Sequence, residues 1–110
     1  MGCVTRCLRV ALALLVIASA ACSAGARMPD RAPDVHGVVA LTRTGEAVLH
    51  GSSDPYFEGM SLERGGPDVA GLGGDRAELG AGDEVEVWVA GPCAESFPVQ
   101  CEIDAVRVTG

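Results

Sequence analysis

The chain has 110 residues and carries eight basic against fifteen acidic side chains, which gives a formal net charge of −7 at pH 7. Residues 1–21 contain two of the basic residues, Arg6 and Arg9, and no acidic one, so residues 22–110 hold six basic and fifteen acidic side chains and a charge of −9. This length suffices for one small domain. The acidic balance argues against binding nucleic acid or anionic lipid through a basic surface.

Residues 1–21 have the three parts of a secretory signal peptide. A basic start is followed by the apolar run Val10–Ala18 and by three small residues, Ser19-Ala20-Ala21, ahead of Cys22. The apolar stretch is shorter than the roughly 20 residues that a membrane-spanning helix needs. We therefore expect export of the chain and removal of residues 1–21.

Two cleavage sites fit this start. Ser19-Ala20-Ala21-Cys22 resembles the lipobox of bacterial lipoproteins, in which the cysteine takes a diacylglyceryl group and becomes the acylated N-terminus. Several acyl chains, each contributing roughly 0.8 kcal/mol per buried CH₂, make attachment persistent. This interpretation predicts lipidation of Cys22, with the protein on the outer side of the cytoplasmic membrane or in the outer membrane. Ala18-Ser19-Ala20 instead fits ordinary signal peptidase, which would release a secreted protein.

Cys93 and Cys101 remain as one pair once Cys22 and the cysteines of the signal are set aside. Disulfides persist in compartments outside the cytoplasm. Closing a nine-residue loop contributes about 2.5 kcal/mol in the chain-entropy model, and the spacing is not a zinc pattern. We expect a structural disulfide, with a redox-active thiol pair as the alternative.

The exported part divides into a tether and a β-rich unit. Residues 22–33 are small, polar and proline-bearing, which is typical of a flexible tether, and the folded domain is expected over 34–110. Five segments have the β-branched content or alternation of strands. They are residues 35–42, 47–50, 56–62, 84–89 and 103–108, the first two joined as a hairpin. The glycine-rich residues 65–82 predict a loop with a short helical turn near 75–79. The pattern predicts an all-β fold, a small five-stranded OB-like barrel.

The C-terminal third is similar to a known family. Gly82-Asp-Glu-Val-Glu-Val-Trp88, Gly91-Pro92, Glu95-Ser-Phe-Pro98 and Ala105-Val-Arg-Val108 resemble the pattern of the YobA-like family of uncharacterised bacterial exported domains. The resemblance covers residues 82–108 and implies a five-stranded OB-like barrel behind a lipoprotein signal. It implies no catalytic residue, and Cys93 and Cys101 depart from the family pattern.

Few residues of the chain suggest catalysis or metal binding. The chain has no G-x-S-x-G, P-loop, H-E-x-x-H or EF-hand pattern, and no cofactor is expected. Its two histidines, His36 and His50, lie in the predicted hairpin. A two-residue Thr44-Gly45 turn would place His50 opposite Val39 and the two imidazoles on opposite faces, although a register slip of one residue reverses this.

A ligand rim is predicted from Trp88, Glu95, Ser96 and Phe97. Trp88 is a recognition candidate if it faces solvent, and otherwise packs under the 65–82 loop. The alternative for Phe97 is that it plugs a barrel end. These features favour a non-enzymatic, lipid-anchored envelope module that binds an envelope protein or a small ligand. A thiol-disulfide protein using Cys93 and Cys101 and a metal-dependent envelope protein using His36 and His50 are the alternatives.

The lipobox predicts the mass of the exported protein. An intact-mass measurement should show loss of residues 1–21 together with the added mass of acyl chains on Cys22. Loss of the same residues without acyl mass would refute the anchor and indicate ordinary secretion.

Overall fold

The computed structural model describes residues 25–110, so the predicted signal peptide and Cys22 lie outside the described residues. The elements are β1 (Val35–Leu41), β2 (Ala47–His50), the 3-10 turn η1 (Pro55–Phe57), β3 (Asp68–Ala70), β4 (Glu84–Ala94) and β5 (Gln100–Val108). Among these residues, no helix has the length and apolar character needed to cross a membrane. The predicted all-β class is confirmed.

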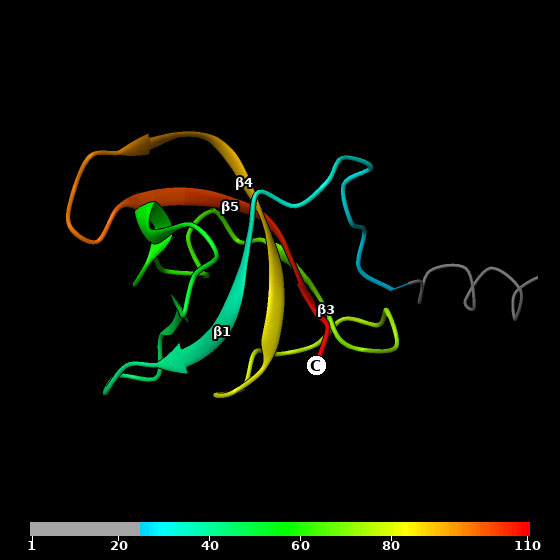
Figure 1. Ribbon diagram of the computed structural model, residues 1–110. Helices are drawn as coiled ribbons and strands as arrows, with labels where there is room; N and C mark the ends of the chain where they lie inside the picture. Colours follow the sequence, from blue (N-terminus) through cyan, green and yellow to red (C-terminus); the bar gives the residue numbers. More distant parts are fainter. Residues whose placement is uncertain (1–24) are drawn as a thin grey trace, which may run out of the picture.

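The five strands form one sheet in the order β2-β1-β4-β5-β3. Every pairing is antiparallel except that of β3 with β5, which is parallel. Figure 1 shows the sheet curling into a half-barrel, because the long β4 and β5 bend across its middle while β1 and β3 flank them. The arrangement is compatible with a small OB-like barrel whose β2 and β3 edges are left unpaired with each other.

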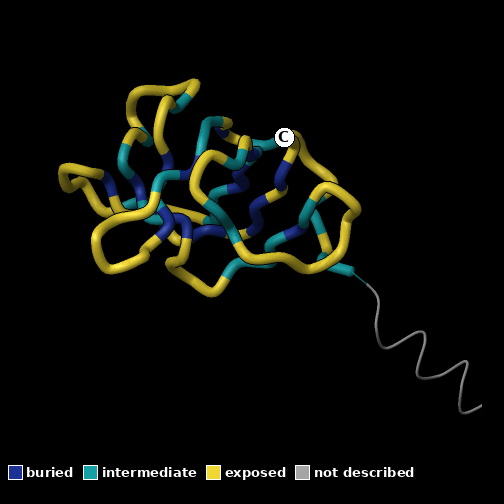
Figure 2. The backbone as a smooth tube through the Cα atoms, turned by 90° about the horizontal axis from the view of Figure 1, so that it is seen from below, coloured by how far each residue is buried: buried dark blue, intermediate teal, exposed yellow. Residues whose placement is uncertain are grey.

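The inner face of the half-barrel holds the hydrophobic core. Alternation along each strand places one apolar residue in two on this face, as the paired Val39 and Leu49 illustrate. Met60 and Leu62 enter the same core from the segment after η1 and are fully buried. Figure 2 shows the buried positions along the interior of the curled chain and the exposed ones on its loops. Burying one such side chain stabilises the fold by roughly 1.5–3 kcal/mol.

The third strand lies elsewhere than predicted. Residues 56–62 do not form a strand: the Asp54 carboxylate accepts a hydrogen bond from the backbone of Tyr56, and Pro55 opens the helical turn η1. The strand is instead β3, inside the predicted loop, where Ala70 is buried beside β5. The predicted helical turn at 75–79 is also wrong, because Ala77 donates its N–H to a carbonyl of β3.

The first hairpin is confirmed, but its register is not the one predicted. Val38 lies opposite His50, and the connection is longer than two residues, with Gly45 at a φ of 86°. This slip of one residue places His36 and His50 on the same outer face of the sheet. Their surroundings differ, since His50 Nδ1 lies 3.0 Å from the Glu58 carboxylate while His36 is paired with β4.

Trp88 is buried on the outer face of the sheet, so its solvent-facing alternative is wrong. Its side chain is 2% exposed, and it stands beside Ala105, on the face opposite to Val87. The contacts of its indole come from outside the 65–82 loop. The indole N–H donates to the Arg31 carbonyl at 2.8 Å, and the Arg107 guanidinium lies 5.3 Å from the ring centroid.

Residues 25–34, the N-terminal strap, run over this outer face. The Asp34 carboxylate accepts hydrogen bonds from Arg31 at 2.8 Å and from the Val89 N–H at 2.7 Å. Partial burial raises the pKa of Asp34, but these hydrogen bonds and the charge of Arg31 outweigh it and hold the pKa below its ordinary value. At the other end of the strap, a side chain on Gly25 would collide with the Gly74 carbonyl, so the two backbones touch. The flexible tether over 22–33 stays a prediction. Gly25 and Arg31, which make two of these contacts, belong to that range.

The contrast between Trp88 and Phe97 predicts their effects on stability. Trp88→Ala should lower the free energy of unfolding by about 3–5 kcal/mol, because it empties a buried site. Phe97→Ala should change it by less than about 0.5 kcal/mol, because Phe97 is fully exposed. Urea unfolding of the two variants measures both. Equal losses would contradict the placement of the two rings.

Candidate functional site

The β4–β5 hairpin extends beyond the body of the half-barrel because its ladder is interrupted and then resumes. Register shifts occur between Trp88 and Val89 and between Val89 and Cys93, and Gly91 adopts a φ of 74°. Such irregularities bend a strand and increase its twist. The two strands pair again from Cys93 onward, and the hairpin carries residues 95–99 at its tip.

The predicted disulfide joins Cys93 to Cys101 and is confirmed. The two residues are direct partners in the β4–β5 ladder, with their Cα atoms 4.2 Å apart. Cys101 is fully buried and Cys93 packs against the core. The bond therefore closes the base of the tip and ties it to the core.

The tip loop is fixed by its own hydrogen bonds. Ser96 donates its backbone N–H to the Ala94 carbonyl at 2.9 Å and its hydroxyl to the Pro98 carbonyl at 2.8 Å. Phe97, between them, is fully exposed, so the alternative that it plugs the barrel is wrong. Val99 enters the core instead. Because the loop turns Val99 into the core, the ring of Phe97 is left in solvent.

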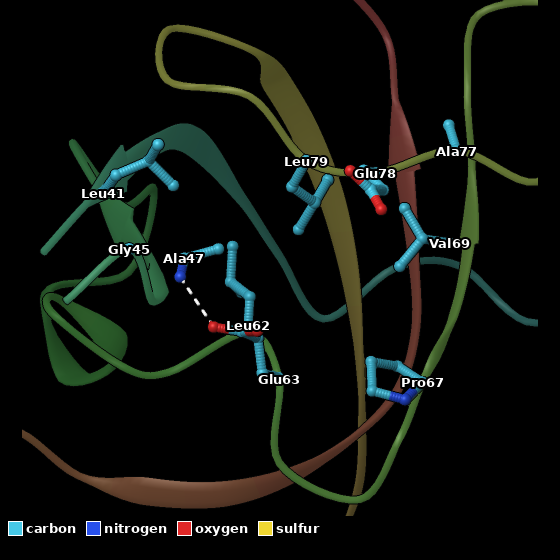
Figure 3. Close-up of a pocket in the computed structure, with 10 residues that line it drawn as sticks. All are labelled: Leu41, Gly45, Ala47, Leu62, Glu63, Pro67, Val69, Ala77, Glu78 and Leu79. Atoms are coloured by element: carbon cyan, nitrogen blue, oxygen red, sulfur yellow. Dashed lines mark hydrogen bonds between the residues drawn. The ribbon is translucent and has the colours of Figure 1, made fainter.

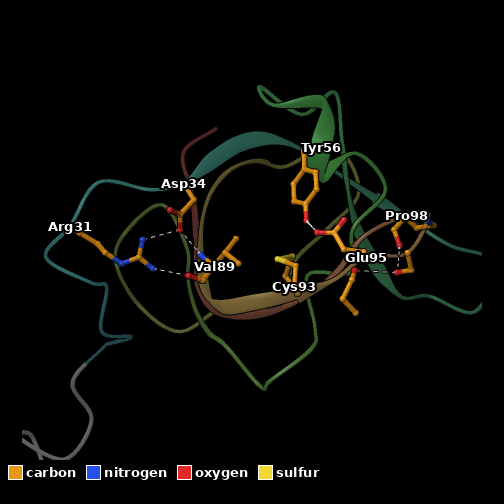
Figure 4. Close-up of a disulfide and its surroundings, with 10 residues drawn as sticks. Arg31, Asp34, Tyr56, Val89, Cys93, Glu95 and Pro98 are labelled. Carbon is orange, nitrogen blue, oxygen red and sulfur yellow. Dashed lines mark hydrogen bonds and ion pairs between the residues drawn. A yellow bond between two sulfur atoms is a disulfide. The ribbon is translucent and has the colours of Figure 1, made fainter.

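Tyr56, which lies in the turn η1, contacts the tip through Glu95. Its hydroxyl donates to the Glu95 carboxylate at 3.0 Å, and its ring meets Phe57 edge to face with centroids 4.9 Å apart (Figure 4). The hydrogen bond to Glu95 raises the pKa of Tyr56 above its ordinary value of 10.0, and burial and the charges of Glu95 and Asp54 act in the same direction. Tyr56, Glu95, Ser96 and Phe97 together form the distal rim.

The structure thus brings together three of the four residues predicted for a ligand rim. Trp88 is the exception, because it is buried under the N-terminal strap. Tyr56 was missed, since it lies 39 positions before Glu95 and no local pattern in the sequence links them. Figure 1 and Figure 4 place the tip and the N-terminal strap on opposite sides of the molecule, with the strap bonded near the middle of β4 at Trp88 and Val89.

The polar groups of the distal rim bond to one another or to the backbone. The Ser96 hydroxyl donates to a backbone carbonyl, and among residues 25–110 no hydrogen bond joins it to a side-chain base. Within residues 25–110, no group of three His, Cys, Asp or Glu side chains is placed to hold a metal ion. What the rim offers is an exposed aromatic ring, a phenol and a carboxylate on a fixed loop.

Comparison with known proteins identifies no relative of this chain. No family model, no curated protein and no solved structure matches it. The function of the distal rim has therefore to be inferred from its own geometry and chemistry.

The pairing of Tyr56 with Glu95 predicts a titration that is easy to observe, because the chain has one tyrosine. Glu95→Gln should lower the pKa of Tyr56 towards its ordinary value, since the neutral amide no longer disfavours the tyrosinate. Ultraviolet absorbance of the tyrosinate during alkaline titration measures it. Glu102→Gln, on the strand beyond the tip, serves as the control and should leave the pKa unchanged. An unaltered Tyr56 pKa in Glu95→Gln would show that the contact does not form in solution.

Proposed function

We propose that this protein is a lipid-anchored, non-enzymatic module of the bacterial cell envelope that holds a protein partner at its distal rim. Lipid on Cys22 would attach it to the outer side of the cytoplasmic membrane or to the outer membrane. The signal-peptide pattern of residues 1–21 and the lipobox ahead of Cys22 support this anchor. Membership of the YobA-like family, proposed from the motifs of residues 82–108, supports the same address.

This proposal rests on the positions of the strap and the distal rim on opposite sides of the molecule. Cys22 is three residues before Gly25, and an extended chain covers at most about 3.6 Å per residue, so the lipid would lie within roughly 11 Å of Gly25. Gly25 in turn touches the Gly74 loop. A lipid on Cys22 would therefore hold the strap end of the domain next to the membrane surface. The distal rim, on the opposite side of the molecule in Figure 1, would face away from the membrane.

The chemistry of the distal rim suits a protein partner. Exposed aromatic rings are enriched among the residues that dominate binding energy at protein interfaces, and Phe97 and Tyr56 are both exposed. The disulfide and the Ser96 hydrogen bonds fix the tip before a partner arrives, which lowers the entropy lost on binding. The carboxylate of Glu95 and the acidic balance of the chain favour a basic surface on that partner.

The two alternatives from the sequence receive less support from the described residues. A thiol-disulfide protein needs an accessible sulfur, whereas Cys101 is fully buried and Cys93 is partly buried against the core. A metal protein would need ligands beside the histidines, but His50 pairs with Glu58 and the nearest ladder partner of His36 is Glu86. Neither pair is completed by a third ligand in the part of the chain that the structure describes.

Affinity capture from envelope extracts tests the proposal. The full-length protein should retain a specific partner, and Phe97→Ser should reduce its capture by about 30-fold, the loss expected when an interface residue worth about 2 kcal/mol is truncated. Leu72→Ser is the matched control, because Leu72 is an exposed apolar residue of the loop beside Gly74. It should leave capture unchanged. Capture that both substitutions reduce equally, or that neither reduces, would refute recognition through the rim.

A further inference from the structure

A cleft of about 400 Å³ opens where the half-barrel is not closed, between β2 and β3. Its walls come from three parts of the chain: the first hairpin, the segment around Leu62, and β3 with the residues that follow it. Figure 3 shows these side chains converging on one space from both sides of the seam. A volume of this size is at the lower end of the range for small-molecule sites, roughly 300–1,000 Å³.

The floor and walls of the cleft present both apolar and polar surface. Leu62 is fully buried beneath it, and Ala47, Val69 and Leu79 line its sides. Leu41 also lines the cleft and is 46% exposed, although it lies opposite the buried Ala47 on the inner face. Apolar surface on the core side of a sheet is thus left accessible at this seam.

The occupant of the cleft is not another strand. On the β2 side, Leu62 donates its N–H to the Ala47 carbonyl, and the Ala47 N–H donates to the Glu63 carboxylate at 2.8 Å. On the β3 side, Ala77 donates to the Val69 carbonyl. The backbone groups that a pairing strand would need are therefore already engaged by the chain itself. An occupant has to bind through the side chains.

The polar groups of the cleft are two carboxylates. Glu63 and Glu78 both line it, and they come from opposite sides of the seam. Among residues 25–110, neither carboxylate takes part in an ion pair. One oxygen of Glu63, Oε2, accepts the hydrogen bond from the Ala47 N–H. The neighbouring Arg64 is directed to Gln100 instead. The cleft thus joins apolar walls to uncompensated negative charge.

We infer that this cleft binds a small molecule that combines an aliphatic stem with one protonated amine. The stem would lie on Leu62, Val69 and Leu79, and the ammonium would pair with the Glu78 carboxylate, while the charge of Glu63 on the other side of the cleft adds to the attraction. An anion of the same shape is repelled by both carboxylates, and a neutral one loses the ionic contact. The inference is independent of the lipid anchor and of the distal rim.

The probe for this site is hexylammonium, with hexanoate and hexanol as its anionic and neutral counterparts. Titration into the isotopically labelled protein, followed by the amide signals of Ala47, Val69 and Ala77, should show saturable binding of hexylammonium. Hexanol should bind at least about 5-fold more weakly, and hexanoate should not bind. Raising the salt concentration should weaken the binding of hexylammonium, because part of it is ionic.

Three variants separate the contributions. Glu78→Gln and Glu63→Gln should each weaken hexylammonium binding about 3-fold or more while leaving hexanol unchanged, and Leu41→Trp should fill the cleft and weaken both. Glu102→Gln, an exposed carboxylate of β5 away from the cleft, is the matched control. If Glu63→Gln disturbs folding, the exposed Glu78 still provides the test. Equal binding of hexanoate, signal changes outside the cleft, or indifference to Glu78→Gln would overturn the inference.

Discussion

The antiparallel pairing of β4 with β5 is the constraint on which the rest of this structure depends. These strands are central in the sheet, so β1 is added to one side of the pair and β3 to the other. Their inner face supplies the core through pairs such as Val87 with Val106. Their outer face supplies a second buried site, where Trp88 stands beside Ala105. The outer face is buried at this site because the N-terminal strap lies over Trp88.

The same ribbon connects the strap and the distal rim, the two parts of the molecule that the proposed function uses. Near the middle of β4, Trp88 and Val89 hold the strap through Arg31 and Asp34. At the tip, the ribbon leaves the barrel after its bulges and is tied again by the disulfide. The strap and the distal rim are therefore joined by paired strands.

The sequence predicted those parts of the structure that local alternation determines. Val85 and Val87 alternate with polar residues, which identified the start of β4, and the cysteine pair identified the base of the tip. Contacts between residues far apart in the chain could not be predicted from the sequence. Trp88 is covered by residues more than 50 positions earlier that have no apolar period, and β3 is too short to show a period before it pairs with β5. At the rim, the local Glu95–Pro98 segment was found, whereas Tyr56 was not.

The open seam follows from how the two short edge strands are satisfied. The edges of β2 and β3 do not meet, because residues 59–62 bond to one and Arg76-Ala77 to the other. Unpaired edges invite aggregation, and covering each with the chain's own backbone removes that hazard without closing the barrel. Closure would have buried Leu41 and Leu62 alike, but the observed arrangement leaves Leu41 accessible. Because the chain's own backbone and the Glu63 carboxylate satisfy these edges, the seam stays open without leaving an unpaired strand edge at the cleft.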